Sequence, residues 1–365
     1  MRVVSFSLLL IALAACTRAP QPEPQTPLGR AAAFLWKQQA EDGGWHSRTY
    51  GLLKSGQSAT PFVLDALLKV PAADYQTPQD KVDKAIAFIR SQTNKDGALG
   101  MMDPTVPDYP NYSTALAVRA LIAAHTPDAQ SQVAALIAYL RTQQFTEPNR
   151  WHPKDAAYGA WGMGGGRRLP PDTGHVDLSM SRYVIEAFRA AGIGPSDPAL
   201  KSARTFIERC QNYDPKHPDD LDGGFFFSTT EFDTNKAGHD GNHFRSYGTT
   251  TADGILALLA VGADINDTRI VAAARWLTAH HNGIRTPGFE GEAYHRWIQG
   301  LAYYYSAASV EAFRALGKGP APGVAADLQQ LQKPDGSWAN TENLVKEDDP
   351  LIATGFAIRA LIESK

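Results

Sequence analysis

Apolar residues recur at helical spacing in six separate stretches of the chain. Leu116, Ala120 and Ala123 illustrate the spacing, since residues three or four positions apart share one face of an α-helix. Several of these stretches are apolar on nearly every face, which is typical of buried helices. No stretch alternates as a β-strand does, apart from the brief Gly224–Ser228. The six predicted buried helices are 58–68, 112–124, 178–191, 249–261, 297–316 and 351–362.

A second kind of segment precedes each buried helix. It is a helix that runs into glutamine, then a turn with Gly or Asp-Gly, then an aromatic or apolar residue. The fifth copy, from Trp276 to Phe289, is degenerate and lacks the glutamine. Two such helices, Lys81–Arg90 and Ala199–Arg209, carry charge on one face, which favours an outer layer. The aromatic or apolar residues that follow the turns are Trp45, Leu99, Trp151, Phe225, Phe289 and Trp338.

The chain therefore contains six copies of a helix–turn–helix unit. One such unit cannot bury its apolar face alone, but neighbouring units can do so by stacking. We predict an all-α fold, an α/α toroid of six helical hairpins with about twelve helices in an inner and an outer ring. The repeat runs from residue 28 to 365 without a linker, which predicts one domain. An open solenoid is the alternative.

Residues 1–27 are predicted to lie outside this domain. One positive charge and an apolar run at 3–15 are typical of a signal peptide, and the run is short for a transmembrane helix. Residues 13–16 resemble the lipobox of bacterial lipoproteins, which implies a signal peptide at 1–15 and a lipid on Cys16. The Pro-rich segment 16–27 would be a tether. This predicts a membrane-anchored protein of the cell envelope, facing the periplasm or the exterior, with the outer membrane favoured in a Gram-negative cell. An ordinary signal peptide with a chance cysteine is the alternative.

The charge and cysteine content of the chain limit its possible binding partners and disulfide bonds. With 35 basic and 38 acidic residues the net charge is −3, so no nucleic-acid partner is expected. Cys210 is the only cysteine besides Cys16, so a lipidated Cys16 leaves no intramolecular disulfide.

The Gln…Asp-Gly-Gly-Trp turns resemble the QW motif of squalene–hopene cyclases, oxidosqualene cyclases and the β subunits of protein prenyltransferases. The resemblance covers essentially the whole mature chain, and it implies an α/α toroid. The catalytic motifs of these families are missing, however. Hopene-forming cyclases start their reaction with an acid in an Asp-x-Asp-Asp motif, and none occurs here. Protein prenyltransferases need a Zn²⁺ held by Asp, Cys and His, but Cys210, the only candidate thiol, falls on the outer-helix side of its hairpin. The Asp-rich Mg²⁺ motif of class I prenyl synthases is also missing. We therefore predict a secreted offshoot without the standard machinery and without a cofactor.

In an α/α ring the loops that lead into the inner helices converge on one mouth of the cavity. The longest are 149–177 and 211–249, and long loops are more often functional than connective. Asp253 lies near the position of the cyclase acid and is the best catalytic candidate, followed by Asp177, since an apolar cavity raises the pKa of a carboxyl group. Alternatively, both acids only stabilise helix N-termini. The candidate ligand-binding residues are His46, Tyr50, Tyr112, His175, Arg245, Tyr247, His295 and Tyr303.

Two further motifs have spacings that suit a metal or a phosphate, but their surroundings favour loops. His239 and His243 have a spacing that could hold a metal, but the flanking glycines favour a flexible loop, so no metal site is predicted. Segment 162–168 combines glycines with two arginines and could hold a phosphate. It lacks the Gly-Lys-Ser/Thr of a phosphate-binding loop, which favours a surface loop.

Three functions stay open. The first is a cyclase-like or prenyltransferase-like protein that binds a small apolar or isoprenoid-type ligand in a central cavity, with or without acid-initiated chemistry. The second is a carbohydrate-active lyase or hydrolase, and the third is a non-catalytic binding or scaffold protein of the cell envelope. A mostly apolar cavity would favour the first, a polar groove with two carboxylates the second, and a filled cavity the third.

Overall fold

The protein was analysed as a computed structural model, which describes residues 24–101, 108–126, 129–241 and 243–365. The predicted signal peptide, the lipidation site Cys16 and most of the predicted tether lie outside the described residues.

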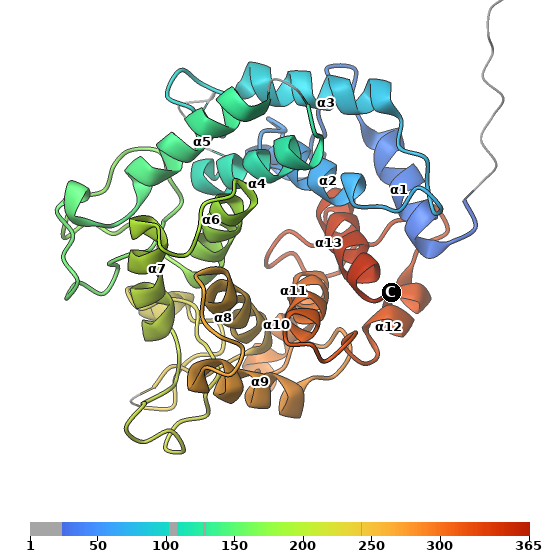
Figure 1. Cartoon of the computed structure of the whole chain (residues 1–365). Helices are drawn as coiled ribbons and strands as arrows, with labels where there is room; N and C mark the ends of the chain where they lie inside the picture. Colours follow the sequence, from blue (N-terminus) through green and yellow to red (C-terminus); the bar gives the residue numbers. More distant parts are fainter. Residues whose placement is uncertain (1–23, 102–107, 127–128, 242) are drawn as a thin grey trace, which may run out of the picture.

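Six helices form an inner ring and six an outer ring around it (Figure 1). The inner helices are α2 (Ala59–Leu68), α4 (Pro110–Ala123), α6 (Leu178–Ala190), α8 (Gly248–Ala260), α11 (Ala302–Ala315) and α13 (Pro350–Glu363). The outer helices are α1 (Pro27–Gln38), α3 (Gln79–Gln92), α5 (Ala129–Gln143), α7 (Pro198–Arg209), α9 (Thr268–His280) and α12 (Val324–Leu331). Each inner helix packs against the next, and α13 packs back against α2.

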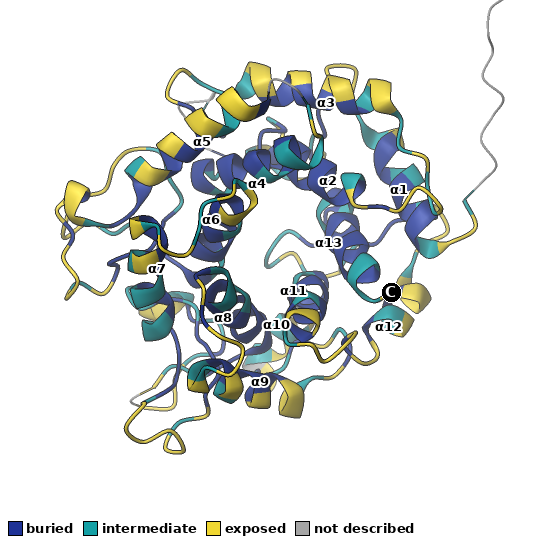
Figure 2. Ribbon diagram, in the orientation of Figure 1, coloured by how far each residue is buried: buried dark blue, intermediate teal, exposed yellow. Residues whose placement is uncertain are grey.

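This closure confirms the predicted all-α toroid and rules out the open solenoid. The inner helices are buried on almost all faces, whereas the outer helices expose one face to solvent (Figure 2). The predicted helix 297–316 is divided at Leu301 into α10 (His295–Gly300) and α11. Four short 3₁₀ turns lie in the loops, namely η1 (Gly51–Leu53), η2 (Glu147–Asn149), η3 (Phe232–Thr234) and η4 (Glu292–Tyr294). Within the described ranges, no helix has the length and apolar character needed to cross a membrane.

The repeated glutamine ties neighbouring units together. Gln332 donates hydrogen bonds to the carbonyl of Gly336 in its own turn at 2.9 Å and to that of Pro27 in α1 at 2.8 Å. The second bond joins the last unit to the first. Gln39, Gln144 and Gln211 make the equivalent pairs of bonds. These glutamines give the turn carbonyls a partner and hold each turn against the first turn of the next outer helix.

In five units, the residue after the turn is fixed by a hydroxyl group of the following inner helix. The N–H of Trp45 donates to Thr60 Oγ1 at 2.9 Å, and its indole donates to the carbonyl of Leu35. In the third unit, Trp161 takes this place, so the prediction of Trp151 was wrong, because an insertion that includes η2 separates the helix end from the turn. The other equivalent bonds join Leu99 to Thr114, Phe225 to Thr251 and Trp338 to Thr354.

The turn glycine lets adjacent units approach closely. Gly159 has a φ of +89°, and a Cβ at this position would lie 1.9 Å from the carbonyl oxygen of Ser202 in the next outer helix. Only glycine has both this backbone freedom and this small size. Gly43, Gly97, Gly223 and Gly336 lie against the next outer helix in the same way.

Candidate functional site

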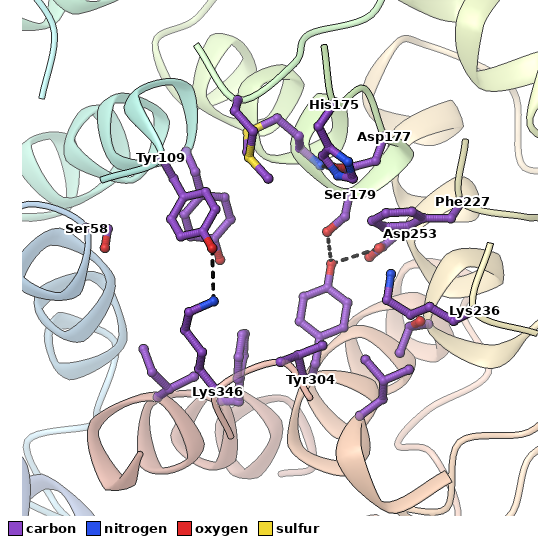
Figure 3. A pocket seen from close by; sticks show the side chains of 18 of the residues that line it. Ser58, Tyr109, His175, Asp177, Ser179, Phe227, Lys236, Asp253, Tyr304 and Lys346 are labelled. Carbon is purple, nitrogen blue, oxygen red and sulfur yellow. Dashed lines mark hydrogen bonds and ion pairs between the residues drawn. The ribbon is translucent and has the colours of Figure 1, made fainter. Parts of the chain in front are cut away.

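A cavity of about 260 Å³ lies inside the ring at the end formed by the N-termini of the inner helices (Figure 3). All six units contribute to its wall. Most of the lining side chains are aliphatic or aromatic, with a few polar groups among them. The lining residues are Leu53, Ser58, Phe62, Tyr109, Tyr112, Met163, His175, Asp177, Ser179, Met180, Phe227, Lys236, Tyr247, Thr249, Asp253, Leu301, Tyr304, Val345, Lys346, Ile352 and Phe356.

Asp253 is a buried carboxyl group at this cavity, with 1% of the residue exposed. It lies on the second turn of α8. Its Oδ1 accepts a hydrogen bond from Arg182 at 2.7 Å, and its Oδ2 accepts one from the hydroxyl of Tyr304 at 2.8 Å. Burial raises the pKa of Asp253 to about 6, although Arg182 and Tyr304 both oppose the rise. A carboxyl group with such a pKa exchanges protons near neutral pH.

Tyr304 connects this carboxyl group to the cavity. Its hydroxyl lies 2.5 Å from Ser179 Oγ as well as contacting Asp253, as Figure 3 shows. Burial holds the pKa of Tyr304 well above its usual value, so the phenol stays protonated. Ser179, Tyr304 and Asp253 thus form a chain of groups along which a proton can pass.

Beneath Asp253 lies a network of buried charges. Arg182 contacts Glu186 at 2.6 Å and also contacts Glu311, in addition to Asp253. Arg359 binds Glu311 at 2.6 Å. Several members of the network line a second depression at the opposite end of the inner helices. We call the whole set the charge network; it comprises Asp65, Lys69, Arg119, Arg182, Glu186, Asp253, Glu311 and Arg359.

His175 bridges two carboxylates at the rim of the cavity. Its Nε2 lies 2.8 Å from Asp177 Oδ2, and its Nδ1 lies 3.0 Å from Glu231 Oε2. The hydrogen bond to Asp177 is the largest of the effects that raise the pKa of His175. Asp177 also caps α6 by accepting from the N–H of Met180 at 2.7 Å. Asp177 therefore has the helix-stabilising role that the sequence left open for it.

Two lysines complete the polar groups of the cavity. Lys346 donates to the hydroxyl of Tyr109 at 2.9 Å. The ammonium of Lys236 lies 3.3 Å from the centre of the Phe227 ring, and burial lowers its pKa to about 8. Neither lysine is among the predicted site residues, which include Tyr303 where the adjacent Tyr304 lines the cavity.

Five of the ten predicted site residues line the cavity, and they are Tyr112, His175, Asp177, Tyr247 and Asp253. The other five are not among the residues that line this cavity. His46 pairs with Asp42, Tyr50 donates to Asp348, Arg245 pairs with Glu290, His295 opens α10 beside a separate depression, and Tyr303 is buried with its N–H donating to Glu347. Within the described chain, no group of three or more His, Cys, Asp or Glu residues is arranged to hold a metal ion.

No protein-family profile matches this chain, and no curated protein has a matching sequence. Solved structures do match. The type II terpene cyclase MstE from Scytonema in its apo form is 15% identical with a TM-score of 0.56, over 92% of this chain and 96% of the cyclase. An MstE variant in complex with its substrate, geranylgeranyl dihydroxybenzoate, gives 13% identity and a TM-score of 0.57 over 93% and 96%.

The unsaturated glucuronyl hydrolase from Bacillus sp. GL1 is equally similar in shape. It is 12% identical with a TM-score of 0.57, over 92% of this chain and 94% of the hydrolase. At such identities the likeness shows the fold, and it places the chain among α/α-toroid proteins. Because one fold carries both a cyclase and a hydrolase, function has to be argued from the cavity.

Proposed function

We propose that this protein binds an apolar or isoprenoid-type small molecule in the central cavity and transfers a proton to it from Asp253. The observation that carries the proposal is a buried carboxyl group with a pKa of about 6 at a largely apolar cavity. Ligand-binding cavities commonly combine an apolar wall with a few convergent polar groups. The MstE complexes with an isoprenoid substrate and product support this ligand class.

The hydrogen bonds suggest how the proton would travel. When Asp253 is ionised, Tyr304 donates to it. When Asp253 is protonated, its O–H donates to the Tyr304 oxygen instead, and the phenolic hydrogen turns toward the ligand. Transfer of that hydrogen to a basic oxygen or a double bond of the ligand leaves Asp253 as a carboxylate paired with Arg182. At pH 7 a pKa of about 6 leaves roughly a tenth of the acid protonated.

The glycan alternative has some support in the glucuronyl hydrolase likeness and in the two carboxylates of the lining. We favour it less for two reasons. Asp177 already contacts His175 and caps the N-terminus of α6. In addition, most of the side chains that line the cavity are aliphatic or aromatic. A sugar ring would leave its hydroxyl groups without partners against such a wall.

Extraction of the purified protein with organic solvent, followed by mass spectrometry, tests the binding part of the proposal. We expect an apolar compound in stoichiometric amount. If turnover of that compound is then found, Asp253→Asn should abolish the turnover while leaving binding and the thermal midpoint nearly unchanged. The control variant Asp80→Asn, on the exposed face of α3, should keep both turnover and binding. A protein that carries no extractable compound and binds no isoprenoid probe would favour the scaffold alternative.

The membrane anchor is a separate part of the proposal. A lipid on Cys16 would hold the ring at a membrane, where apolar ligands are concentrated. Cell fractionation tests this. The wild-type protein should sediment with membranes, and Cys16→Ser should move to the soluble fraction. An unaltered distribution of the variant would remove the anchor from the proposal.

A further inference from the structure

Lys236 differs from the buried cations of the charge network. Arg119, Arg182 and Arg359 each contact at least one carboxylate. For the ammonium of Lys236, the described part of the chain offers no carboxylate within ion-pair distance and no hydrogen-bond acceptor. Its contacts are with aromatic faces, 3.3 Å from the ring centre of Phe227 and 5.7 Å from that of Trp297.

The acids nearest to this ammonium already have partners. Asp177 is held by His175 at 2.8 Å, and Asp253 is held by Arg182 at 2.7 Å. Both attract Lys236 only at longer range, and burial outweighs them, so that the pKa of Lys236 falls to about 8. The Lys236 ammonium has three N–H donors, and no described residue accepts them. A bound oxyanion could accept them in charge-assisted hydrogen bonds, which are stronger than neutral ones.

We infer that Lys236 binds an oxyanion of the ligand, so that the molecule in the cavity is an apolar chain with one carboxylate or phosphate end. The inference rests on the proposed function, because it assumes that the cavity holds an apolar ligand. It adds the polar end of that ligand and the residue that recognises it.

The position of Lys236 fits an end-on ligand. Together with His175 and Phe227, it lines both the central cavity and an outer depression that includes Phe232 and Trp297. Lys236 therefore forms part of the wall between the apolar interior and the outer surface. A charged end at this wall stays close to water, while the apolar chain extends into the cavity. Figure 3 shows the Lys236 side chain across the cavity from Lys346.

The test compares three probes with the same chain and different ends, which are farnesol, farnesoic acid and farnesyl phosphate. Their dissociation constants are measured by titration calorimetry on the full chain. We expect at least one anionic probe to bind about tenfold or more tighter than farnesol, as one charge-assisted hydrogen bond allows. Lys236→Met should remove this preference and leave the affinity for farnesol within about twofold. Methionine keeps the apolar stem against Phe227, and far-ultraviolet circular dichroism checks the fold.

Lys346→Met is the matched control, since Lys346 is also a cavity lysine but has a hydrogen-bond partner in Tyr109. It should keep the preference for the anionic probe. If farnesol binds as tightly as both anions, or if the preference survives in Lys236→Met, the inference is overturned and the proposed function stands. If none of the three probes binds the folded protein, the proposed function fails with it. The phosphate and carboxylate probes distinguish the two kinds of oxyanion.

Discussion

Replacing Arg182 by methionine tests the electrostatics on which the proposed acid depends. Arg182 is 1% exposed and contacts three carboxylates at once. After the replacement, Glu186 keeps Arg119 and Glu311 keeps Arg359. Asp253 would keep only the hydroxyl of Tyr304 among the contacts that the structure describes. The loss of ion-pair stabilisation should therefore fall mainly on Asp253.

The magnitude follows from the cost of an unpaired buried charge. Removing one partner of a buried ion pair typically costs about 3–5 kcal/mol. Asp253 can avoid part of this cost by taking up a proton. An acid whose pKa is higher in the folded protein than in the unfolded chain binds more protons when folded, so stability falls as pH rises between the two values. For the wild type this interval runs from 3.8 to about 6.

In Arg182→Met the interval extends upward, because the cation that lowers the pKa of Asp253 is gone. Each further unit of pKa is worth about 1.4 kcal/mol. If the pKa of Asp253 rises by about two units, the free energy of unfolding of the variant should fall by about 2.7 kcal/mol more than that of the wild type between pH 6 and pH 8. Urea unfolding at pH 5 and pH 8 measures the difference. The variant should be more severely destabilised at pH 8.

Two control variants test whether the effect comes from the unpaired charge of Asp253. Arg141→Met breaks a half-exposed pair with Asp197 on the outer surface, which should cost less than about 1 kcal/mol at either pH. The double variant Arg182→Met/Asp253→Asn removes the stranded charge and should recover stability at pH 8. An equal loss at pH 5 and pH 8, or a double variant no more stable than the single one, would refute the reasoning.

Three shorter predictions follow from other parts of the structure. Gly159→Ala should cost about 2 kcal/mol or more in thermal unfolding, because its Cβ would strike a backbone carbonyl, whereas Gly166→Ala, which has nothing within 4 Å, should be nearly neutral. Tyr304→Phe removes a donor that lowers the pKa of Asp253, so this pKa, followed by carbon NMR of the carboxyl group, should rise above 6. Because the pKa of His175 is raised in the folded protein, protonated His175 stabilises the wild type below pH 6.5, and this stability is lost as pH rises through the raised pKa. His175→Gln should lack this pH-dependent contribution, which chemical denaturation across pH 5 to 9 would detect.

The ring could be predicted from sequence because its determinants are local and repeated. Most units carry a glutamine, a turn glycine and an aromatic residue, although the second unit has Leu99 in place of the aromatic residue and the fifth lacks the glutamine. The paired bonds of the glutamine recur in four units. Closure follows when the sixth unit repeats the first, as the bond from Gln332 to Pro27 shows. The prediction failed in the third unit because an insertion separates the helix end from its turn, so that Gly159-Ala160-Trp161, and not Trp151, carries the repeated Gly-x-Trp pattern.

The candidate site was harder to predict because it depends on which side of a helix faces inward. Tyr303 and Tyr304 are neighbours in sequence, yet only Tyr304 lines the cavity. The helical period separates their side chains by about 100°. Lys236 lies in a long loop without periodicity, so nothing in the sequence indicates that it reaches the cavity. Asp253 could be found because it occupies a fixed place near the start of an inner helix.

The charge network explains why the cavity opens at one end of the ring in particular. The cavity at one end of the inner helices is largely apolar, whereas the depression at the other end is lined by members of the charge network. The network has four cations and four carboxylates, so it carries no net charge when all are ionised. Buried ion pairs seldom stabilise a fold more than apolar side chains of similar volume would.

Their placement therefore points to a role besides stability. Asp253 is the one carboxylate of the network that also lines the apolar cavity. An apolar ligand is kept from the charged end because entry would strip water and partners from charged groups. It would stop at the level of Asp253 and Tyr304, where the carboxyl group with a pKa of about 6 lies. The network thus bounds the cavity, and Arg182 opposes the rise that burial causes in the pKa of Asp253, so changes to Arg182 should alter ligand position and proton transfer together.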